Sequence, residues 1–190
     1  MNIYLAGPDV FLPDAVEMGR RKAVICARYG VTGRYPLDNV IERAAADVSL
    51  QIFKANEAMM DACEAIIANL TPFRGPGADA GTVYELGYMA GRGKLCLGYS
   101  NDPTLYADRV RGFTETEGRD GRLIDRSGLT VEDFGHADNL MMIHALELHG
   151  VPLVLPRAKP ADLWQDLTAF EVCVRMASEH VAITKNRNML

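Results

Sequence analysis

Short apolar runs alternate along this chain with longer stretches in which apolar residues recur every three or four positions. The runs are bounded by Gly, Pro and polar residues, as buried β-strands are, and they lie at residues 2–6, 31–37, 65–70 and 95–99. The stretches with helical spacing predict α-helices at residues 13–29, 44–62, 81–91, 137–149 and 162–180. This alternation predicts an α/β fold with a parallel, Rossmann- or flavodoxin-like sheet and helices on both of its faces.

Two regions add detail to this pattern. The helix at residues 44–62 has one apolar face, formed at helical spacing by Val48, Ile52, Ala55 and Met59. Residues 100–135 are polar and rich in Gly and Asp, which predicts a long connection that serves as a lid, an oligomer contact or a partly disordered loop. Because no internal repeat, low-complexity tract or linker is present, residues 1–190 are predicted to form a single domain.

The composition is that of an ordinary globular protein, with 48% apolar and 24% charged residues. A net charge of −5 argues against nucleic acid or an anionic membrane as the partner, and no apolar stretch is long enough to span a bilayer. The N-terminus lacks the basic and apolar regions of a signal peptide. The four cysteines, at positions 26, 63, 96 and 173, are spaced as buried free thiols, so a cytoplasmic protein is expected.

Residues 64–91 hold the strongest candidate for a functional site. An apolar strand there leads into a loop with two Pro and three Gly, and the loop leads into a helix with Glu85 near its first turn. In open α/β sheets, small ligands bind where a strand passes through such a loop into a helix. Asp79 lies on the loop, six residues before Glu85, and is close enough to share the same pocket.

Enzymes that cleave a glycosidic bond usually use two carboxyl groups that lie in different surroundings. A position near the helix N-terminus would favour an ionised, nucleophilic Glu85, while Asp79 would handle a proton. The alternative is that Glu85 is an ordinary helix residue and Asp79 an ordinary turn residue.

Three further residues are expected at the same edge of the sheet. Tyr4 lies within the first strand, near its carboxyl end, and can offer its hydroxyl to a carboxylate, although a core tyrosine bonded to backbone is an equal alternative. Gly7 would let the backbone approach a ligand closely. Asp38 follows the second strand but is more typical of a turn or cap. The chain has no P-loop, no GxSxG element and no metal-ligand spacing of His and acidic residues.

The segments IYLAGPDVF, YPLDN, ANLTPFRGPGADAGTVYELGYMAG and FGHADNLMM, taken together, resemble the nucleoside 2-deoxyribosyltransferase family. The resemblance spans most of the chain, and the order and separation of PFRG, DxGT and ExG make the central segment specific. It implies a homo-oligomer that acts on 2′-deoxynucleosides and free nucleobases without a metal or organic cofactor.

The resemblance also implies a role for each matching residue. Glu85 would attack C1′ of the sugar, Tyr4 would hold Glu85, and Asp79 would contact the base and move its proton. Asp14, also the expected N-cap of the first helix, would bind the sugar hydroxyls. Asn139 and Met141 would be contributed to the active site of a neighbouring subunit, across the interface.

One position departs from the family pattern. Some members carry a base-contacting Asp where this chain has Asn56, which can form hydrogen bonds but cannot donate a full proton. Two alternatives to a transferase remain. One is an N-glycosidase that hydrolyses deoxynucleosides or their 5′-monophosphates, although the loop GPDVFLPD has no Ser or Arg for a phosphate. The other is a non-catalytic nucleotide-sensing module.

Overall fold

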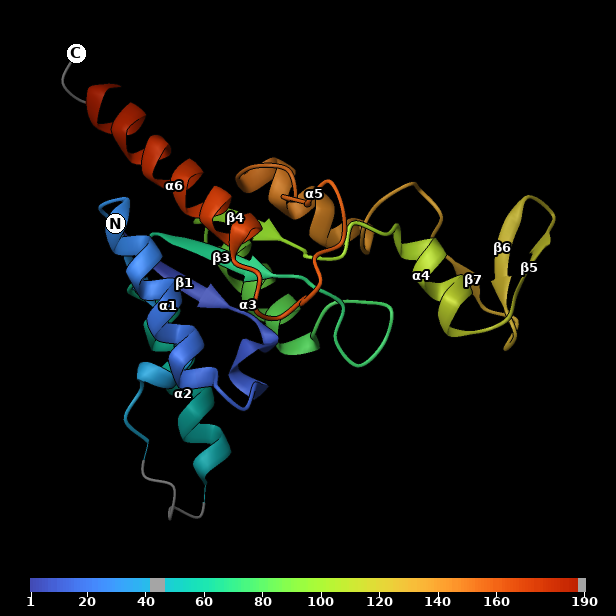
Figure 1. Ribbon diagram of the computed structural model, residues 1–190, viewed down its shortest axis with the longest axis horizontal. Helices are drawn as coiled ribbons and strands as arrows, with labels where there is room; N and C mark the ends of the chain where they lie inside the picture. The colour runs from blue at the N-terminus through green and yellow to red at the C-terminus, as the bar shows by residue number, and fades with distance from the viewer. Residues whose placement is uncertain (42–46, 188–190) are drawn as a thin grey trace.

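The computed structural model describes residues 1–41 and 47–187. A parallel sheet with strand order β2-β1-β3-β4 forms its centre (Figure 1). The strands are β1 (Asn2–Ala6), β2 (Thr32–Arg34), β3 (Ala65–Asn69) and β4 (Leu95–Tyr99). The prediction of a parallel α/β fold is therefore confirmed, with β1 and β3 in the middle of the sheet, where both faces are covered.

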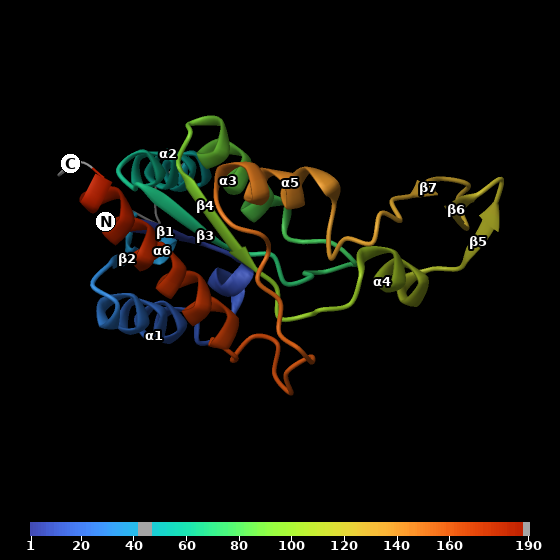
Figure 2. The same cartoon turned by 90° about the horizontal axis from the view of Figure 1, so that it is seen from above.

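Helices cover both faces of the sheet (Figure 2). One face packs against α1 (Ala15–Arg28) and α6 (Thr168–Arg187). The other packs against α3 (Ala80–Gly91) and α5 (Leu140–His149), with α2 (Val48–Asp61) beside them.

The alternation of side chains along β1 divides the core into two layers. Ile3 and Leu5 pack in the cluster that includes Phe170 of α6, whereas Tyr4 packs in the cluster that includes Leu86 of α3. Successive side chains of a strand point to opposite faces, so Tyr4 is directed toward the helix that contains Glu85.

Several predicted boundaries differ from the structure. The second strand is short because Pro36 opens the single turn η2 (Pro36–Asp38), and the helix predicted from residue 162 begins only at Thr168. Residues before Thr168 form turns in which Asp162 accepts hydrogen bonds from the backbone N–H groups of Trp164 and Gln165. The predicted start of the second helix, residue 44, lies outside the described residues.

Residues 100–135 form a folded arm that projects from the body of the molecule, where the sequence predicted a long connection that serves as a lid, an oligomer contact or a partly disordered loop (Figures 1 and 2). The arm consists of α4 (Tyr106–Phe113) and an antiparallel sheet of β5 (Thr116–Arg119), β6 (Arg122–Asp125) and β7 (Thr130–Val131). The overlooked signal is Asp120-Gly121, two residues of positive φ that join β5 to β6 in a tight hairpin.

All four cysteines are free and buried, as their spacing predicted. Within residues 1–41 and 47–187, no helix combines the length and the hydropathy needed to cross a bilayer. In the same ranges, no group of three or more His, Cys, Asp and Glu side chains is arranged to hold a metal ion.

Candidate active site

Tyr4 and Glu85 meet at the carboxyl end of the sheet. The Tyr4 hydroxyl donates a hydrogen bond of 2.5 Å to Oε1 of Glu85, and the Tyr4 side chain is completely buried. Glu85 lies on the second turn of α3, since that helix begins at Ala80, so the expected place near the first turn is corrected. Its partner is therefore the phenol of a neighbouring strand rather than the free N–H groups of the helix end.

Burial determines the charge state of Glu85. Loss of solvent raises the pKa of Glu85 from its ordinary 4.5 to about 7, the Tyr4 hydrogen bond opposes this rise, and the negative charge of Asp79 adds to it. Burial, together with the neighbouring Glu85, also raises the pKa of Tyr4, so the phenol stays protonated as a donor. The pKa of Glu85 thus lies above its ordinary value, where the sequence predicted a helix N-terminus that favours the ionised form, because desolvation outweighs the hydrogen bond from Tyr4.

Asp79 is the N-cap of α3. Its Oδ2 atom accepts hydrogen bonds from the Thr82 backbone N–H at 2.9 Å and from the Thr82 hydroxyl at 3.0 Å. The interpretation of Asp79 as a structural turn residue is thus correct for its local contacts. It also lines the same cleft as Glu85, so capping fixes the carboxylate beside the pocket rather than removing it from there.

The cleft has a volume of about 740 Å³ and opens above Glu85. It is lined by two predicted binding residues, Gly7 and Asn56. A Cβ atom at Gly7 would come within 2.4 Å of the Asp9 carboxylate and 2.8 Å of Asn69 Cβ, so only glycine fits this part of the pocket floor. The apolar face predicted for α2 contributes Val48 and Ile52 to the wall of the cleft.

Sequence reasoning missed Asn39, which lines the same cleft as Glu85. Its side-chain amide donates a 3.0 Å hydrogen bond to Oδ1 of Asn56, so the two amides form one polar patch on an otherwise apolar wall. The position of Asn39 after the second strand was the available signal. Its neighbour Asp38 instead accepts a hydrogen bond from the Tyr35 backbone N–H, as expected for a cap.

Three predicted residues are not brought to this cleft by their own chain. Asp14 occupies the N-cap position of α1, but its exposed carboxylate accepts a hydrogen bond from Gln165 and does not cap the helix. Asn139 caps α5 through Met141 N–H and donates to Glu132 at 2.7 Å, while the Met141 side chain is 71% exposed.

Substituting Tyr4 with Phe should move the acidic limb of the kcat/KM profile to higher pH. The Tyr4 hydroxyl holds the pKa of Glu85 down, so without it a larger share of Glu85 is protonated and unable to act as a nucleophile near neutral pH. A loss of about tenfold at pH 6.5 that shrinks above pH 8 is expected. Tyr84→Phe is the matched control, because Tyr84 on the same helix donates to Glu57 at the surface. An unshifted acidic limb in Tyr4→Phe would show that the phenol does not tune Glu85.

Comparison with known proteins gives a consistent picture. Residues 3–141 match the model of a family described as nucleoside 2-deoxyribosyltransferase. An uncharacterized protein of Schizosaccharomyces pombe is 35% identical over 164 residues, which cover 78% of this chain and 78% of that protein.

Solved structures show the same fold. A 2-deoxyribosyltransferase from Leishmania mexicana is 32% identical with a TM-score of 0.61, and the match covers 91% of this chain and 96% of that one. A conserved protein from Enterococcus faecalis V583 has a TM-score of 0.57 at 15% identity, over 93% of this chain and 98% of that one, and supports the fold alone.

Proposed function

The chain belongs to the nucleoside 2-deoxyribosyltransferase family, and we propose that it transfers a 2-deoxyribosyl group between nucleobases through a covalent intermediate on Glu85. The resemblance seen in the sequence is thus confirmed at the level of the family. The observation that supports the reaction best is the buried Tyr4–Glu85 pair at the floor of a cleft that Asp79 also lines.

The first half of the reaction uses both carboxyl groups. Because Tyr4 occupies Oε1 of Glu85, Oε2 is the oxygen left to attack C1′ of a bound 2′-deoxynucleoside. The C1′–N bond breaks through an oxocarbenium-like transition state, which the negative charge of Glu85 stabilises before a C1′–O bond forms. The proton that the departing ring nitrogen needs is delivered through the Asp79 carboxyl group, so the base leaves neutral.

The second half reverses these steps with another base. The incoming ring nitrogen attacks C1′ on the face that the first base left, the C1′–O bond to Glu85 breaks, and Asp79 takes up the proton. The configuration at C1′ is retained after two displacements. A close wall at C2′ would reject ribose, whose 2′-hydroxyl also makes the cation harder to form.

The remaining contacts of the proposal concern the base and the second subunit. Asn39 and Asn56 offer amide donors and acceptors to the edge of a base that lies against the apolar wall. Asn139 and Met141 are proposed to complete the site of a neighbouring copy, and Asp14 to reach the sugar hydroxyls only if Gln165 releases it.

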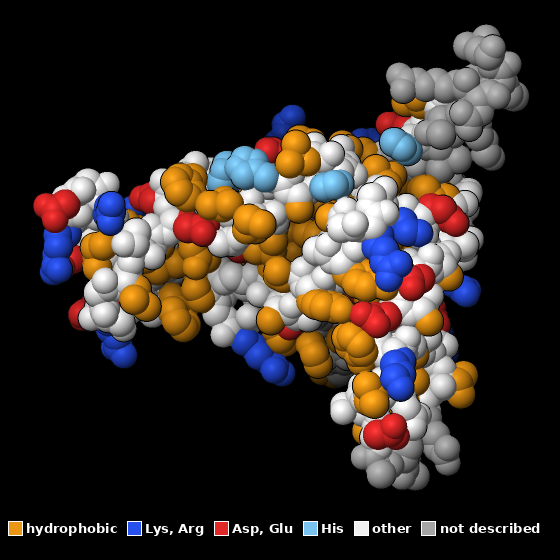
Figure 3. All heavy atoms as spheres, turned by 180° about the vertical axis from the view of Figure 1, so that it is seen from behind, with side chains coloured by type: hydrophobic (Ala, Val, Ile, Leu, Met, Phe, Trp, Pro, Cys, Tyr) orange, Lys and Arg blue, Asp and Glu red, His pale blue; other side chains and the backbone are white. Residues whose placement is uncertain are grey.

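Exposed apolar residues support a homo-oligomer. They gather on the arm and the adjoining part of the body (Figure 3). Those more than half exposed include Phe113, Leu129, Phe134, Met141 and Leu148. Large apolar patches on soluble proteins usually mark interaction surfaces, and a second copy is the partner that the shared-site proposal requires.

Incubation with deoxyinosine, with and without free adenine, tests the proposed reaction. Deoxyadenosine is expected to form only when adenine is present, because the second base must attack the covalent intermediate. Adenosine production from inosine and adenine should be at least about tenfold slower, because ribose carries the 2′-hydroxyl that the cation and the pocket disfavour. Chromatography of the products measures both.

Other outcomes of this assay would change the proposal. If hypoxanthine were released at the same rate with and without adenine, the protein would be an N-glycosidase. Absence of turnover on purine and pyrimidine deoxynucleosides and on their 5′-monophosphates would favour a nucleotide-sensing module.

A further inference from the structure

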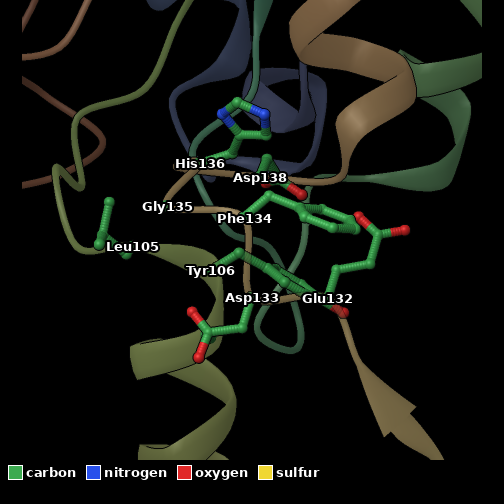
Figure 4. Close-up of a pocket in the computed structure, with 9 residues that line it drawn as sticks. Leu105, Tyr106, Glu132, Asp133, Phe134, Gly135, His136 and Asp138 are labelled. Atoms are coloured by element: carbon green, nitrogen blue, oxygen red, sulfur yellow. The ribbon is translucent and has the colours of Figure 1, made fainter. Parts of the chain in front are cut away.

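The base of the arm contains a buried ion pair outside the cleft. Arg109 of α4 contacts the Asp138 carboxylate at 3.0 Å, and the two side chains are only 7% and 2% exposed. Asp138 lies beside Tyr106 and Phe134, between the arm and the body (Figure 4). The gap that Tyr106, Phe134 and Asp138 help to line has no room for a water molecule.

Arg109 ties three segments together through its three nitrogens. Nε donates to the Pro76 carbonyl at 2.7 Å, Nη1 to the Thr104 carbonyl at 2.8 Å, and Nη2 to Asp138. Pro76 belongs to the Gly-rich loop that leads into Asp79, and Thr104 lies where the chain enters the arm. The rigid fork of a guanidinium is suited to such multiple bonding, whereas a lysine amine is not.

Asp138 contacts the same loop one residue before Asp79. Its carboxylate accepts hydrogen bonds from the backbone N–H groups of Ala78 and of Asn139, the latter at 2.8 Å. A Cβ atom on Gly77 would lie 3.7 Å from Oδ1 of Asp138, which shows how closely the loop passes the carboxylate. One carboxylate therefore holds both Ala78, the residue before Asp79, and Asn139 itself.

Stability alone is a poor explanation for this arrangement. Burial raises the pKa of Asp138 even though Asn139 N–H and Arg109 oppose the rise, so desolvation outweighs the attraction within the pair. Buried ion pairs are often no more stabilising than apolar residues of similar size. What the pair supplies, and an apolar pair would not, is a fixed direction for the loop that ends at Asp79.

We propose that Arg109 and Asp138 are positioning residues that hold Asp79 in the place required for proton transfer to the base. The inference rests on the proposed function, because it requires Asp79 to move that proton. Neither residue lines the cleft with Glu85, so both act through the Pro76–Asp79 segment rather than on the substrate itself. A displacement of about 1 Å at a catalytic group can cost on the order of 10²-fold in rate.

Arg109→Lys tests the proposal, with exchange from deoxyinosine to adenine as the readout. Lysine keeps the charge but cannot bond Pro76, Thr104 and Asp138 together, so kcat should fall by about 10–100-fold. The KM for deoxyinosine should stay within about threefold, since the other residues that line the cleft keep their places. Arg111→Met is the matched control, because Arg111 on the same helix forms its ion pairs with Asp108 and Asp133 at the surface and should leave kcat within about twofold.

A double-mutant cycle separates positioning from a general structural effect. In an Asp79→Asn background, Arg109→Lys should lower kcat by less than about threefold, because the group that it positions no longer holds a proton. Asp138→Asn provides a second variant and should show the same dependence on Asp79, because the neutral amide weakens the bond to Arg109 while its oxygen can still accept the Ala78 N–H.

Each other result would overturn the inference. Losses that multiply in the double variant would mean that Arg109 acts independently of Asp79, and a full loss of folding in both Arg109→Lys and Asp138→Asn would assign the pair to stability. If Asp79→Asn by itself left kcat unchanged, there would be no proton transfer to position. Failure of the proposed function is distinct from these, because the wild-type protein would then show no exchange.

Discussion

Glu85→Gln should lower base exchange by on the order of 10³-fold or more, because an amide cannot form the covalent bond to C1′. Gln has nearly the same shape, and its oxygen can still accept the hydrogen bond from Tyr4, so the cleft should be preserved. Deoxynucleoside binding, measured by calorimetry, should therefore remain within about tenfold of the wild type.

The same variant should be more stable than the wild type at neutral and alkaline pH. The folded pKa of Glu85, about 7, lies above its ordinary value of 4.5, so the folded state binds this proton more tightly than the unfolded chain. The stability that the proton contributes is complete below about pH 4.5 and is lost as the pH rises through about 7. Gln is neutral at every pH, so the variant does not lose this stability as the pH rises.

The size of this gain is bounded by the pKa difference. It corresponds to at most about 3 kcal/mol in the free energy of unfolding, which for a chain of this size is several degrees in Tm. The gain should be complete at pH 8 and fall nearly to zero at about pH 4, as scanning calorimetry would measure. Glu57→Gln is the matched control, since Glu57 also accepts a tyrosine hydroxyl but at the surface, and it should show no such pH dependence.

Two results would contradict this account of Glu85. If Glu85→Gln exchanged bases at a rate within tenfold of the wild type, Glu85 could not be the nucleophile. A Tm difference independent of pH would mean that burial does not raise the pKa of this carboxyl.

Asp79→Asn should lower kcat by about 10²–10⁴-fold, the usual contribution of a positioned acid. Asparagine caps helices about as well as aspartate, so the bonds to Thr82 and the start of α3 should survive, and Tm should change by no more than a few degrees. The variant thus removes the proton and keeps the cap.

Asp79→Ala separates the two roles of this residue. It lacks both the proton and the cap, and should cost a further ~1 kcal/mol of stability for the same loss of rate. If Asp79→Asn retained wild-type kcat while Asp79→Ala lost both stability and activity, capping would be the whole role of Asp79.

The sequence by itself determined the central sheet and predicted that Tyr4 and Glu85 lie at one edge of it. The apolar runs located β1, β3 and β4 within a residue, because a strand buried on both faces must be apolar at nearly every position. The carboxyl ends of parallel strands share one edge, which is why Tyr4, Gly7 and the loop before α3 could be expected to meet.

The hairpin of the arm could have been predicted from the sequence but was missed. The Asp120-Gly121 signal is local, yet it lies in a polar segment whose short strands have little apolar alternation to mark them. Strands that are solvated on most sides give no hydrophobic period, so only the turn between them identifies the hairpin.

Tertiary structure alone decided the pKa of Glu85, the surroundings of α2 and the partners of Arg109. Tyr4 and Glu85 are 81 residues apart, and Arg109 and Asp138 are 29 apart, so no local period relates them. The apolar residues of α2 have the same helical spacing whether their face packs in a core or lines a cleft. Only the packing of the whole chain places Val48 and Ile52 in the wall of the cleft. Hydrophobic periodicity reports which side of an element is buried, but a pKa or an ion pair depends on which distant groups share that burial.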